Sequence, residues 1–160
     1  MIIDIMNKSV RETTLEHIRR VNELMKESAV IILNRGSKHD ESKLSEPEAF
    51  GFESLGNDFR KFKYGSEEYY KKVNDPRFQE AVKHHHMVNR HHIEHFKNGI
   101  KDMNLFDIIE MICDWKAASE RQENSVFEEH IQVNFYRFGI PDEYKNMIIN
   151  TAKALGFINL

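Results

Sequence analysis

Histidines that could bind a metal ion are concentrated in one stretch of the chain. The sequence has nine histidines, and six of them lie between positions 84 and 95. Imidazole is a common metal ligand, but neighbouring histidines on a helix point in different directions, so the six cannot all bind one ion. On a helix His85 and His92 would share one face, and His84, His91 and His95 would share another. We expect at least two of the six to contact a metal or a phosphate group.

Three further residues of ligand type lie earlier in the chain. His39 and Asp40 are adjacent, and such a pair can supply one nitrogen and one oxygen to a divalent ion if both side chains face inward. His17 lies at the edge of an apolar helical stripe, four and seven residues before Val21 and Leu24. The alternative for the pair is an exposed turn, and the alternative for His17 is a half-buried core histidine.

Acidic residues also occur in one of the most apolar segments. Asp107, Glu110 and Asp114 are spaced i, i+3 and i+7, so one helix face would carry three carboxylates. Asp107 is explained as a helix cap, and Glu110 is either solvated or the partner of a metal-binding histidine. Asp114 is the hardest to explain by structure alone, because a buried aspartate is nearly always paired or bound to a metal.

The elements that must position these residues are predicted to be helices. Capping boxes are expected at Thr13 with Glu16 and at Ser125 with Glu128, and no run of alternating residues predicts a strand. The fold class is therefore all-α, a single compact domain over 1–160 with five to seven helices. The expected helices cover about 13–33, a short piece from 39, a short piece near 69–73, 76–98, 104–121, 125–138 and 141–155, with 51–66 mostly loop. Arg35-Gly36-Ser37 would end the first helix, and Pro47 and Gly51 would break the second. Asp75-Pro76 would start the helix from 76, and Asn104 with Asp107 would cap the helix from 104.

Composition excludes several classes of protein. The chain has 160 residues, 40% hydrophobic and 31% charged, which is typical of one soluble globular domain. A net charge of −3 disfavours nucleic acid as a partner. The single cysteine, Cys113, excludes an intrachain disulfide and is expected to be buried. With neither a membrane span nor a signal peptide in the sequence, we expect a cytoplasmic protein with no membrane partner.

The ligand-type residues occur in a familiar order. His17, His39-Asp40 and Asp114 in an all-helical chain resemble the ligand order of the HD-domain superfamily of metal-dependent phosphohydrolases. The stretch from His39 to Lys43 is similar to the His-Asp-x-Gly-Lys form of cyclic-dinucleotide phosphodiesterases in that superfamily, with Ser42 in the glycine position. The Gly-Tyr-Pro signature of the cyclic-di-GMP branch is absent, so that substrate is not supported.

A closer resemblance is to a family of uncharacterised bacterial and phage proteins, over about His17 to Arg121. Ile93 stands where proline is expected, which leaves the choice among His91, His92 and His95 open. The stretches that carry this resemblance are His85-x-x-x-Asn89-Arg90-His91-His92-x-Glu94-His95 and Asn104-Leu105-Phe106-Asp107-x-x-Glu110-Met111-x-Cys113-Asp114-Trp115-Lys116-Ala117-Ala118-Ser119.

The resemblance to the HD superfamily implies a metal site and a reaction. One divalent ion would be Mn, Fe, Co, Ni or Zn rather than Ca, because the ligands mix nitrogen and oxygen. Asp40 could bridge to a second ion, and metal-activated water would attack the phosphorus of a small phosphoester, with a nucleotide as the expected substrate. The implied ligands are His17, His39, Asp40 and Asp114 for the first ion, and His85 with His91 or His92 for the second.

The resemblance also implies how the substrate is held. Lys43 would contact its phosphate, so Asp40 and Lys43 are the candidate catalytic residues. Lys116 and Arg121 are weaker candidates for the same contact, and Asn89 is a further candidate substrate-binding residue. A homo-oligomer is compatible with the sequence, and a phage-encoded protein would act in the host cytoplasm.

Two other functions fit parts of the sequence. His91-His92-Ile93-Glu94-His95 satisfies the H-x-x-E-H motif of inverted zincins, in which two histidines bind zinc and the glutamate is the base. That metallopeptidase reading gives no role to His39-Asp40 or Asp114. A non-catalytic protein that binds a metal or nucleotide and regulates a partner would use the same residues as the hydrolase.

Overall fold

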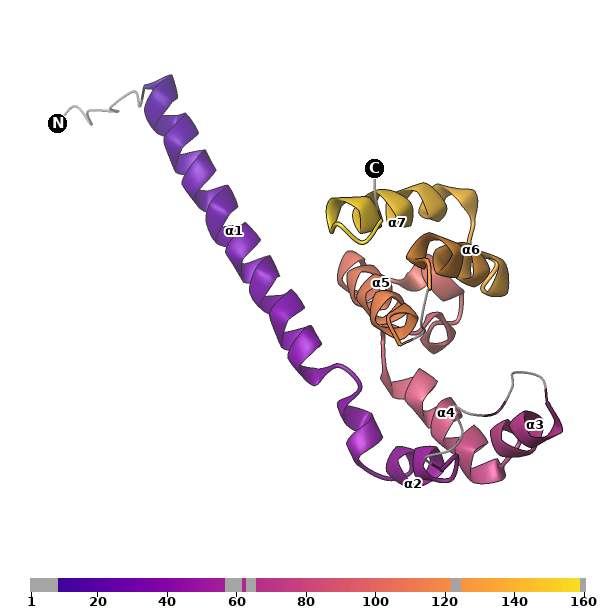
Figure 1. Ribbon diagram of the computed structural model, residues 1–160. Helices are drawn as coiled ribbons and strands as arrows, with labels where there is room; N and C mark the ends of the chain where they lie inside the picture. The colour runs from indigo at the N-terminus through magenta and orange to yellow at the C-terminus, as the bar shows by residue number, and fades with distance from the viewer. Residues whose placement is uncertain (1–8, 57–61, 63–65, 122–124, 159–160) are drawn as a thin grey trace. The chain divides into compact units, whose positions relative to one another are not determined.

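The computed structural model describes residues 9–56, 62, 66–121 and 125–158 (Figure 1). Secondary structure in these residues is entirely helical, with seven α-helices, so the all-α class is confirmed. Contacts divide the chain into two units, one that ends at Ser37 and one that begins at Lys38. The single domain expected over 1–160 therefore stays a prediction. None of the helices described is long and apolar enough to cross a bilayer.

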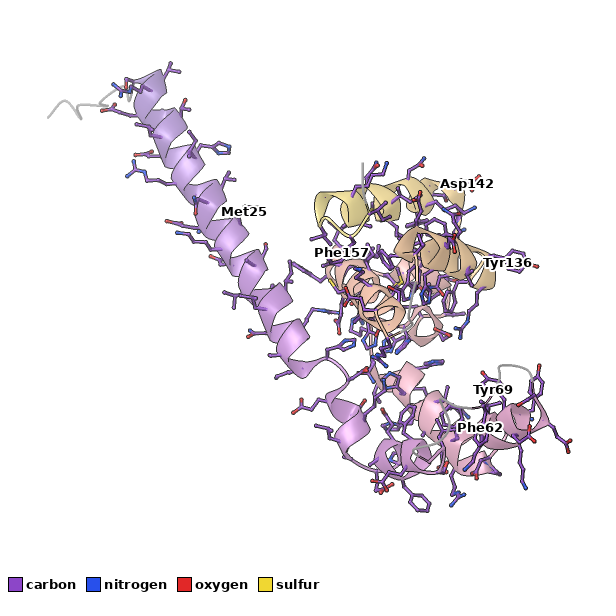
Figure 2. All side chains as sticks on the ribbon, in the orientation of Figure 1. Met25, Phe62, Tyr69, Tyr136, Asp142 and Phe157 are labelled. Carbon is purple, nitrogen blue, oxygen red and sulfur yellow. The ribbon has the colours of Figure 1, made fainter. Side chains whose placement is uncertain are left out.

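The described residues of the N-terminal unit form one long helix, α1 (Val10–Lys38), whose last residue belongs to the second unit. It begins earlier than predicted, because the capping box is formed by Ser9 and Glu12 and not by Thr13 and Glu16. The Ser9 N–H donates to Glu12 Oε2 (2.9 Å), and the Glu12 N–H donates to Ser9 Oγ (3.3 Å). The predicted stop at Arg35-Gly36-Ser37 was also wrong, since the helix continues through Gly36. Apolar side chains such as Met25 project from it (Figure 2).

The second unit contains the remaining helices. Its core is built mainly by α5, α6 and α7, where Trp115 stacks on Phe138 with ring centroids 6.1 Å apart and Phe127 meets Phe157 edge to face. Phe157 is labelled in Figure 2. The elements are the α-helices α2 (Glu48–Glu53), α3 (Glu67–Val73), α4 (Pro76–Val88), α5 (Leu105–Ser119), α6 (Phe127–Arg137) and α7 (Asp142–Ala154), and the 3-10 helices η1 (Glu41–Leu44), η3 (Ile93–His95) and η4 (Gly99–Asp102).

The predicted starts of α4 and α5 are confirmed, and the predicted cap of α6 is not. Asn104 and Asp107 form a reciprocal capping box at the start of α5, and Pro76 follows the capping residue Asp75 at the start of α4. Ser125 and Glu128 do not cap α6, which begins at Phe127 without a side-chain cap. Cys113, expected to be buried, is exposed.

Helix α2 lies where the sequence predicted a break and then a loop. It packs against α4 through Gly51: a Cβ at this position would overlap Ala81 and would lie 2.5 Å from the carbonyl oxygen of Arg77. Glycine is therefore used here for close packing of two helices and not for a turn. This contact brings Glu48, at the start of α2, against the histidines of α4.

Helix α4 ends ten residues before the predicted end at Asn98. No glycine or proline marks the end at Val88. Instead Asn89 leaves the helical conformation, and its side-chain amide donates to the carbonyl oxygen of His85 (3.0 Å). The chain then turns back, so His91 and His92 both come close to His85, whereas the continuous helix expected from the sequence would place only His92 on the face of His85.

Candidate metal centre

Asp40 stands at a backbone turn that separates it from α1. Its φ of 58° is the one positive value of a non-glycine residue in the ranges described. This conformation costs about 1–2 kcal/mol for a residue with a side chain, and such strain is concentrated at functional sites. The turn starts η1, and the N–H of Lys43 donates to the carbonyl oxygen of Asp40 (2.9 Å). His39 faces Glu110 and Asp114, and Asp40 faces His85 and His91.

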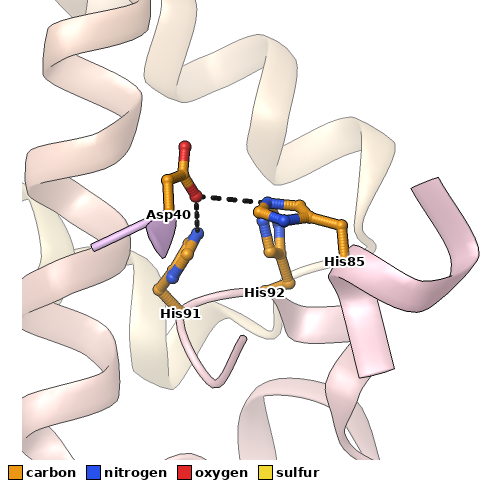
Figure 3. Close-up of side chains that lie close together, drawn as sticks. All are labelled: Asp40, His85, His91 and His92. Carbon is orange, nitrogen blue, oxygen red and sulfur yellow. Dashed lines mark ion pairs between the residues drawn. The ribbon is translucent and has the colours of Figure 1, made fainter. Parts of the chain in front are cut away.

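Four side chains in the second unit direct ligand atoms toward one point. One atom each from Asp40, His85, His91 and His92 lies within 4.8 Å of the others. Asp40 Oδ1 is 3.2 Å from His85 Nε2 and 3.5 Å from His91 Nε2 (Figure 3). We refer to these four residues as the Asp40 cluster. Three nitrogens and one carboxylate oxygen form a donor set that suits a transition ion.

A buried carboxylate orients His85 in this cluster. Glu48 is completely buried and accepts from His85 Nδ1 (2.7 Å), His84 Nδ1 (2.8 Å) and Ser42 Oγ (2.9 Å). A carboxylate can only accept, so we assign a proton to Nδ1 of His85, and Nε2 then presents its lone pair to the cluster. This is the arrangement by which carboxylates orient metal-binding histidines. The sequence analysis missed Glu48.

A second carboxylate, that of Glu110, orients His91 and His39. Oε1 of Glu110 lies 3.2 Å from His91 Nδ1 and 3.0 Å from His39 Nδ1. His39 Nε2 faces Asp40 Oδ2 (3.6 Å) and Asp114 Oδ1 (3.5 Å), and His39, Asp40 and Asp114 form a second group of ligand atoms. Asp40 belongs to both groups, with one oxygen toward each. Glu110 therefore lies where a partner of metal-binding histidines would lie, one of its two predicted alternatives.

The carboxylates and burial shift the pKa values of these groups in different directions. Asp114 and then Glu110 raise the pKa of His39 to about 10. Burial, followed by His91 and His85, lowers the pKa of His92 to about 3. Burial alone would raise the pKa of Asp40, but His85, His91 and Lys43 hold it well below its usual value. The site thus holds ionised carboxylates beside histidines that must be neutral to bind a metal.

The polar atoms at the centre of the Asp40 cluster have no hydrogen-bond partner. Among described residues, five buried side-chain atoms lack one, and four of these are Asp40 Oδ1, His85 Nε2, His91 Nε2 and His92 Nε2. A buried polar atom left unsatisfied costs about 1–3 kcal/mol, so four at one point would be a large penalty without a ligand. All four are atoms that can bind a metal, so the residues fit a divalent transition ion.

The other predicted site residues have different surroundings. His17 lies on α1 in the N-terminal unit, and its role as a ligand stays a prediction. Lys43 contacts Asp40 through its ammonium group, 2.5 Å from Oδ2. Asn89 donates to Ser42 Oγ (2.8 Å) and so ties η1 to the end of α4. Lys116 pairs with Glu120 (3.0 Å). Arg121 is exposed just beyond α5.

The H-x-x-E-H motif does not have the geometry of a zincin. His91 precedes the 3-10 helix η3 and His95 ends it, so they are not one turn apart on an α-helix. His91 belongs to the Asp40 cluster, and the groups of ligand atoms in the described ranges do not include His95. Glu94 lies instead with His86 and His92 in a third group. The geometry thus argues against the metallopeptidase reading.

Comparison with known families agrees with part of the sequence analysis. A model described as a family of unknown function (DUF5662) matches residues 6–158. The chain belongs to this family. No curated protein and no solved structure matches the chain. This result accords with the resemblance to an uncharacterised family, while membership of the HD superfamily stays a prediction.

Proposed function

We propose that this protein of the DUF5662 family is a metal-dependent phosphohydrolase that acts on a small phosphoester. The observation that carries the proposal is the convergence of four unsatisfied buried atoms in the Asp40 cluster, with a lysine ammonium group on the same aspartate. A bound divalent ion would supply a Lewis acid and a water of lowered pKa. The chain's own residues supply the geometry and the charge around it.

The ligands have distinct tasks in this proposal. His85, His91, His92 and Asp40 would hold the ion, since their unsatisfied atoms face one another, and Asp40 also faces His39 in the group with Asp114. Glu48 and Glu110 hold the rings of His85 and His91 in the required tautomer. The water oxygen would bond to phosphorus as the phosphorus–oxygen ester bond breaks, and the leaving oxygen takes a proton.

Lys43 supplies positive charge at the edge of the cluster. Its ammonium group has three donors, and its described contacts are with Asp40 and the Phe52 ring, 5.3 Å from the centroid. The side chain is 35% exposed, so a phosphate can reach it. Lys43 would neutralise a phosphoryl oxygen in the transition state. A Lys43→Ala variant should keep its metal but lose about 10²–10³-fold in kcat/KM, and Lys43→Arg should recover little.

Metal analysis and a hydrolysis assay on one preparation test the proposal. Purified protein should contain at least one transition ion per chain and should hydrolyse bis(p-nitrophenyl) phosphate or p-nitrophenyl phosphate. A chelator should abolish turnover, and added Mn²⁺ or Zn²⁺ should restore it. Asp40→Asn should lose metal and turnover, while Asp142→Asn, on the exposed first turn of α7, should lose neither.

Each result has a clear reading. Unchanged metal content in Asp40→Asn would refute the site. Bound metal without turnover of any phosphoester would refute the hydrolase and leave the alternative of a non-catalytic metal-binding regulatory protein.

A further inference from the structure

A pocket lies near the Asp40 cluster, and two of its lining residues, Lys43 and Phe52, contact members of that cluster. Its volume is about 490 Å³, and it is lined by Lys43, Leu44, Ala49, Phe52, Glu53 and Gly56. That volume is in the range of small-molecule sites. The pocket lies wholly within the second unit, on η1, α2 and the turn after α2.

Two of the lining residues connect the pocket to the proposed metal site. Lys43 pairs with Asp40, and its ammonium group also lies over the Phe52 ring. The Phe52 ring meets the His85 ring edge-on, with centroids 6.0 Å apart. A ligand whose phosphate binds Lys43 could therefore contact the Phe52 ring with the rest of the molecule.

The lining has the chemistry of a site for a phosphorylated molecule with an apolar part. Lys43 is the cation for the phosphate, and Phe52 and Leu44 supply apolar surface, with Leu44 84% exposed and held by no core contact. Glu53 adds a carboxylate that can accept from hydroxyl or amino groups. A nucleotide combines these three requirements in one molecule: phosphate, sugar hydroxyls and a planar base.

We propose that this pocket, which we call the Phe52 pocket, binds the nucleoside part of a nucleoside phosphate whose phosphate lies at Lys43 and the Asp40 cluster. The proposal rests on the proposed function for the reaction, but the pocket can be tested without turnover. Phe52 and Leu44 are then the residues that determine specificity, because they contact the base and leave the phosphate to Lys43.

Binding to metal-free protein provides the test. Dissociation constants of adenosine 5′-monophosphate, ribose 5-phosphate and inorganic phosphate are measured by NMR titration in the presence of a chelator. The adenosine nucleotide should bind at least tenfold more tightly than ribose 5-phosphate, because base–aromatic contact contributes about 1–3 kcal/mol. Phe52→Leu and Leu44→Asp should reduce this ratio to about threefold or less. Inorganic phosphate should bind Phe52→Leu as tightly as wild type, whereas the added carboxylate of Leu44→Asp weakens all three phosphates alike and leaves the ratio as the readout.

Helix α2 offers a matched control. Phe50 is 51% exposed on the same helix, lies under Arg77 and does not line the pocket, so Phe50→Leu should keep the wild-type ratio. Circular dichroism of each variant shows that it is folded, and Leu44→Asp keeps the test valid if Phe52→Leu unfolds.

The proposal would be overturned by equal binding of the nucleotide and ribose 5-phosphate to wild type, or by an unchanged ratio in folded Phe52→Leu and Leu44→Asp. Its failure is distinguishable from failure of the proposed function. Chelator-sensitive hydrolysis of p-nitrophenyl phosphate together with no preference for the nucleotide refutes the pocket alone. A preference that depends on Phe52, in a protein without metal or hydrolysis, supports the pocket and refutes the hydrolase.

Discussion

Replacing Glu48 by methionine should weaken metal binding without touching a ligand. The substitution keeps the volume of a completely buried side chain but removes the acceptor of His85 Nδ1, which lies 2.7 Å away. His85 is only 4% exposed, so water cannot replace the lost acceptor. An unpaired N–H in such a place costs about 1–3 kcal/mol.

The ring can avoid this cost by moving its proton. Asp40 Oδ1 lies 3.2 Å from His85 Nε2, so a proton on Nε2 has an acceptor at once. In that tautomer the lone pair is on Nδ1 and faces away from the cluster. The proton must return from Nε2 to Nδ1 before Nε2 can bind a metal. The free energy required should therefore match the cost of the unpaired N–H. A 10–100-fold loss of affinity, the usual result of removing such a partner, corresponds to about 1.4–2.8 kcal/mol and agrees with it.

Two further variants separate tautomer from charge. Glu48→Gln can keep an oxygen at the position of Oε2, where it accepts from both His85 and Ser42, so it should lose less than tenfold. Glu53→Gln removes a charge from an exposed residue of the same helix and should have no effect on metal affinity.

Competition with a chromogenic chelator gives the affinity of each variant for Zn²⁺. The ¹⁵N chemical shifts of His85 in the metal-free proteins report its tautomer, which should change in Glu48→Met alone. If folded Glu48→Met binds Zn²⁺ as tightly as wild type, Glu48 does not control the site and the reasoning fails.

The fold and the electrostatics of the site make three more predictions. Gly51→Ala should lower the free energy of unfolding in urea by about 1–3 kcal/mol and also weaken metal binding, because the new methyl group forces α2 off Ala81 and moves Glu48; wild-type values for both would contradict it. Asn104→Ala removes the cap of α5 and should cost about 1 kcal/mol while metal affinity stays unchanged, so a matching loss of metal would show that the cap supports the site. Because the pKa of His39 is raised to about 10, its contribution to the free energy of unfolding is full below pH 6.5 and is lost as pH rises toward 10. Metal-free His39→Gln should lack this decline in the free energy of unfolding, and an equal decline in both proteins would refute the assignment.

Local signals predicted much of the helical structure. Asn104 with Asp107 and Asp75 with Pro76 identified the starts of α5 and α4, because a cap depends on residues three or fewer positions apart. The boundary of α1 was missed for the same local reason. Two capping pairs, Ser9 with Glu12 and Thr13 with Glu16, follow each other in the sequence, and the first one forms.

The ligand types were predictable, but their arrangement was not. His39-Asp40 and the histidine run were identified by residue type, and Asp114 by its apolar neighbours. A continuous helix predicted that His92 would share a face with His85 and that His91 would lie on another face. Both histidines join His85 in the structure, because Asn89 ends that helix. Glu48 carried no signal, since a glutamate after a proline is ordinary in a loop and only the contact of Gly51 with α4 buries it.

Three features of this site are unusual in the interior of a folded protein. Asp40 has a left-handed backbone conformation, Glu48 is a buried carboxylate, and His85 presents an unpaired nitrogen to the interior. Each breaks a rule of local consistency, and rules of this kind are broken mainly where function requires it. Scattered over the chain they would be separate defects, but here Glu48 contacts His85 and His85 faces Asp40. One bound cation would interact with the facing nitrogen lone pairs and with the Asp40 carboxylate at the same time. Metal binding therefore explains the shared position of these features better than three independent compromises in packing.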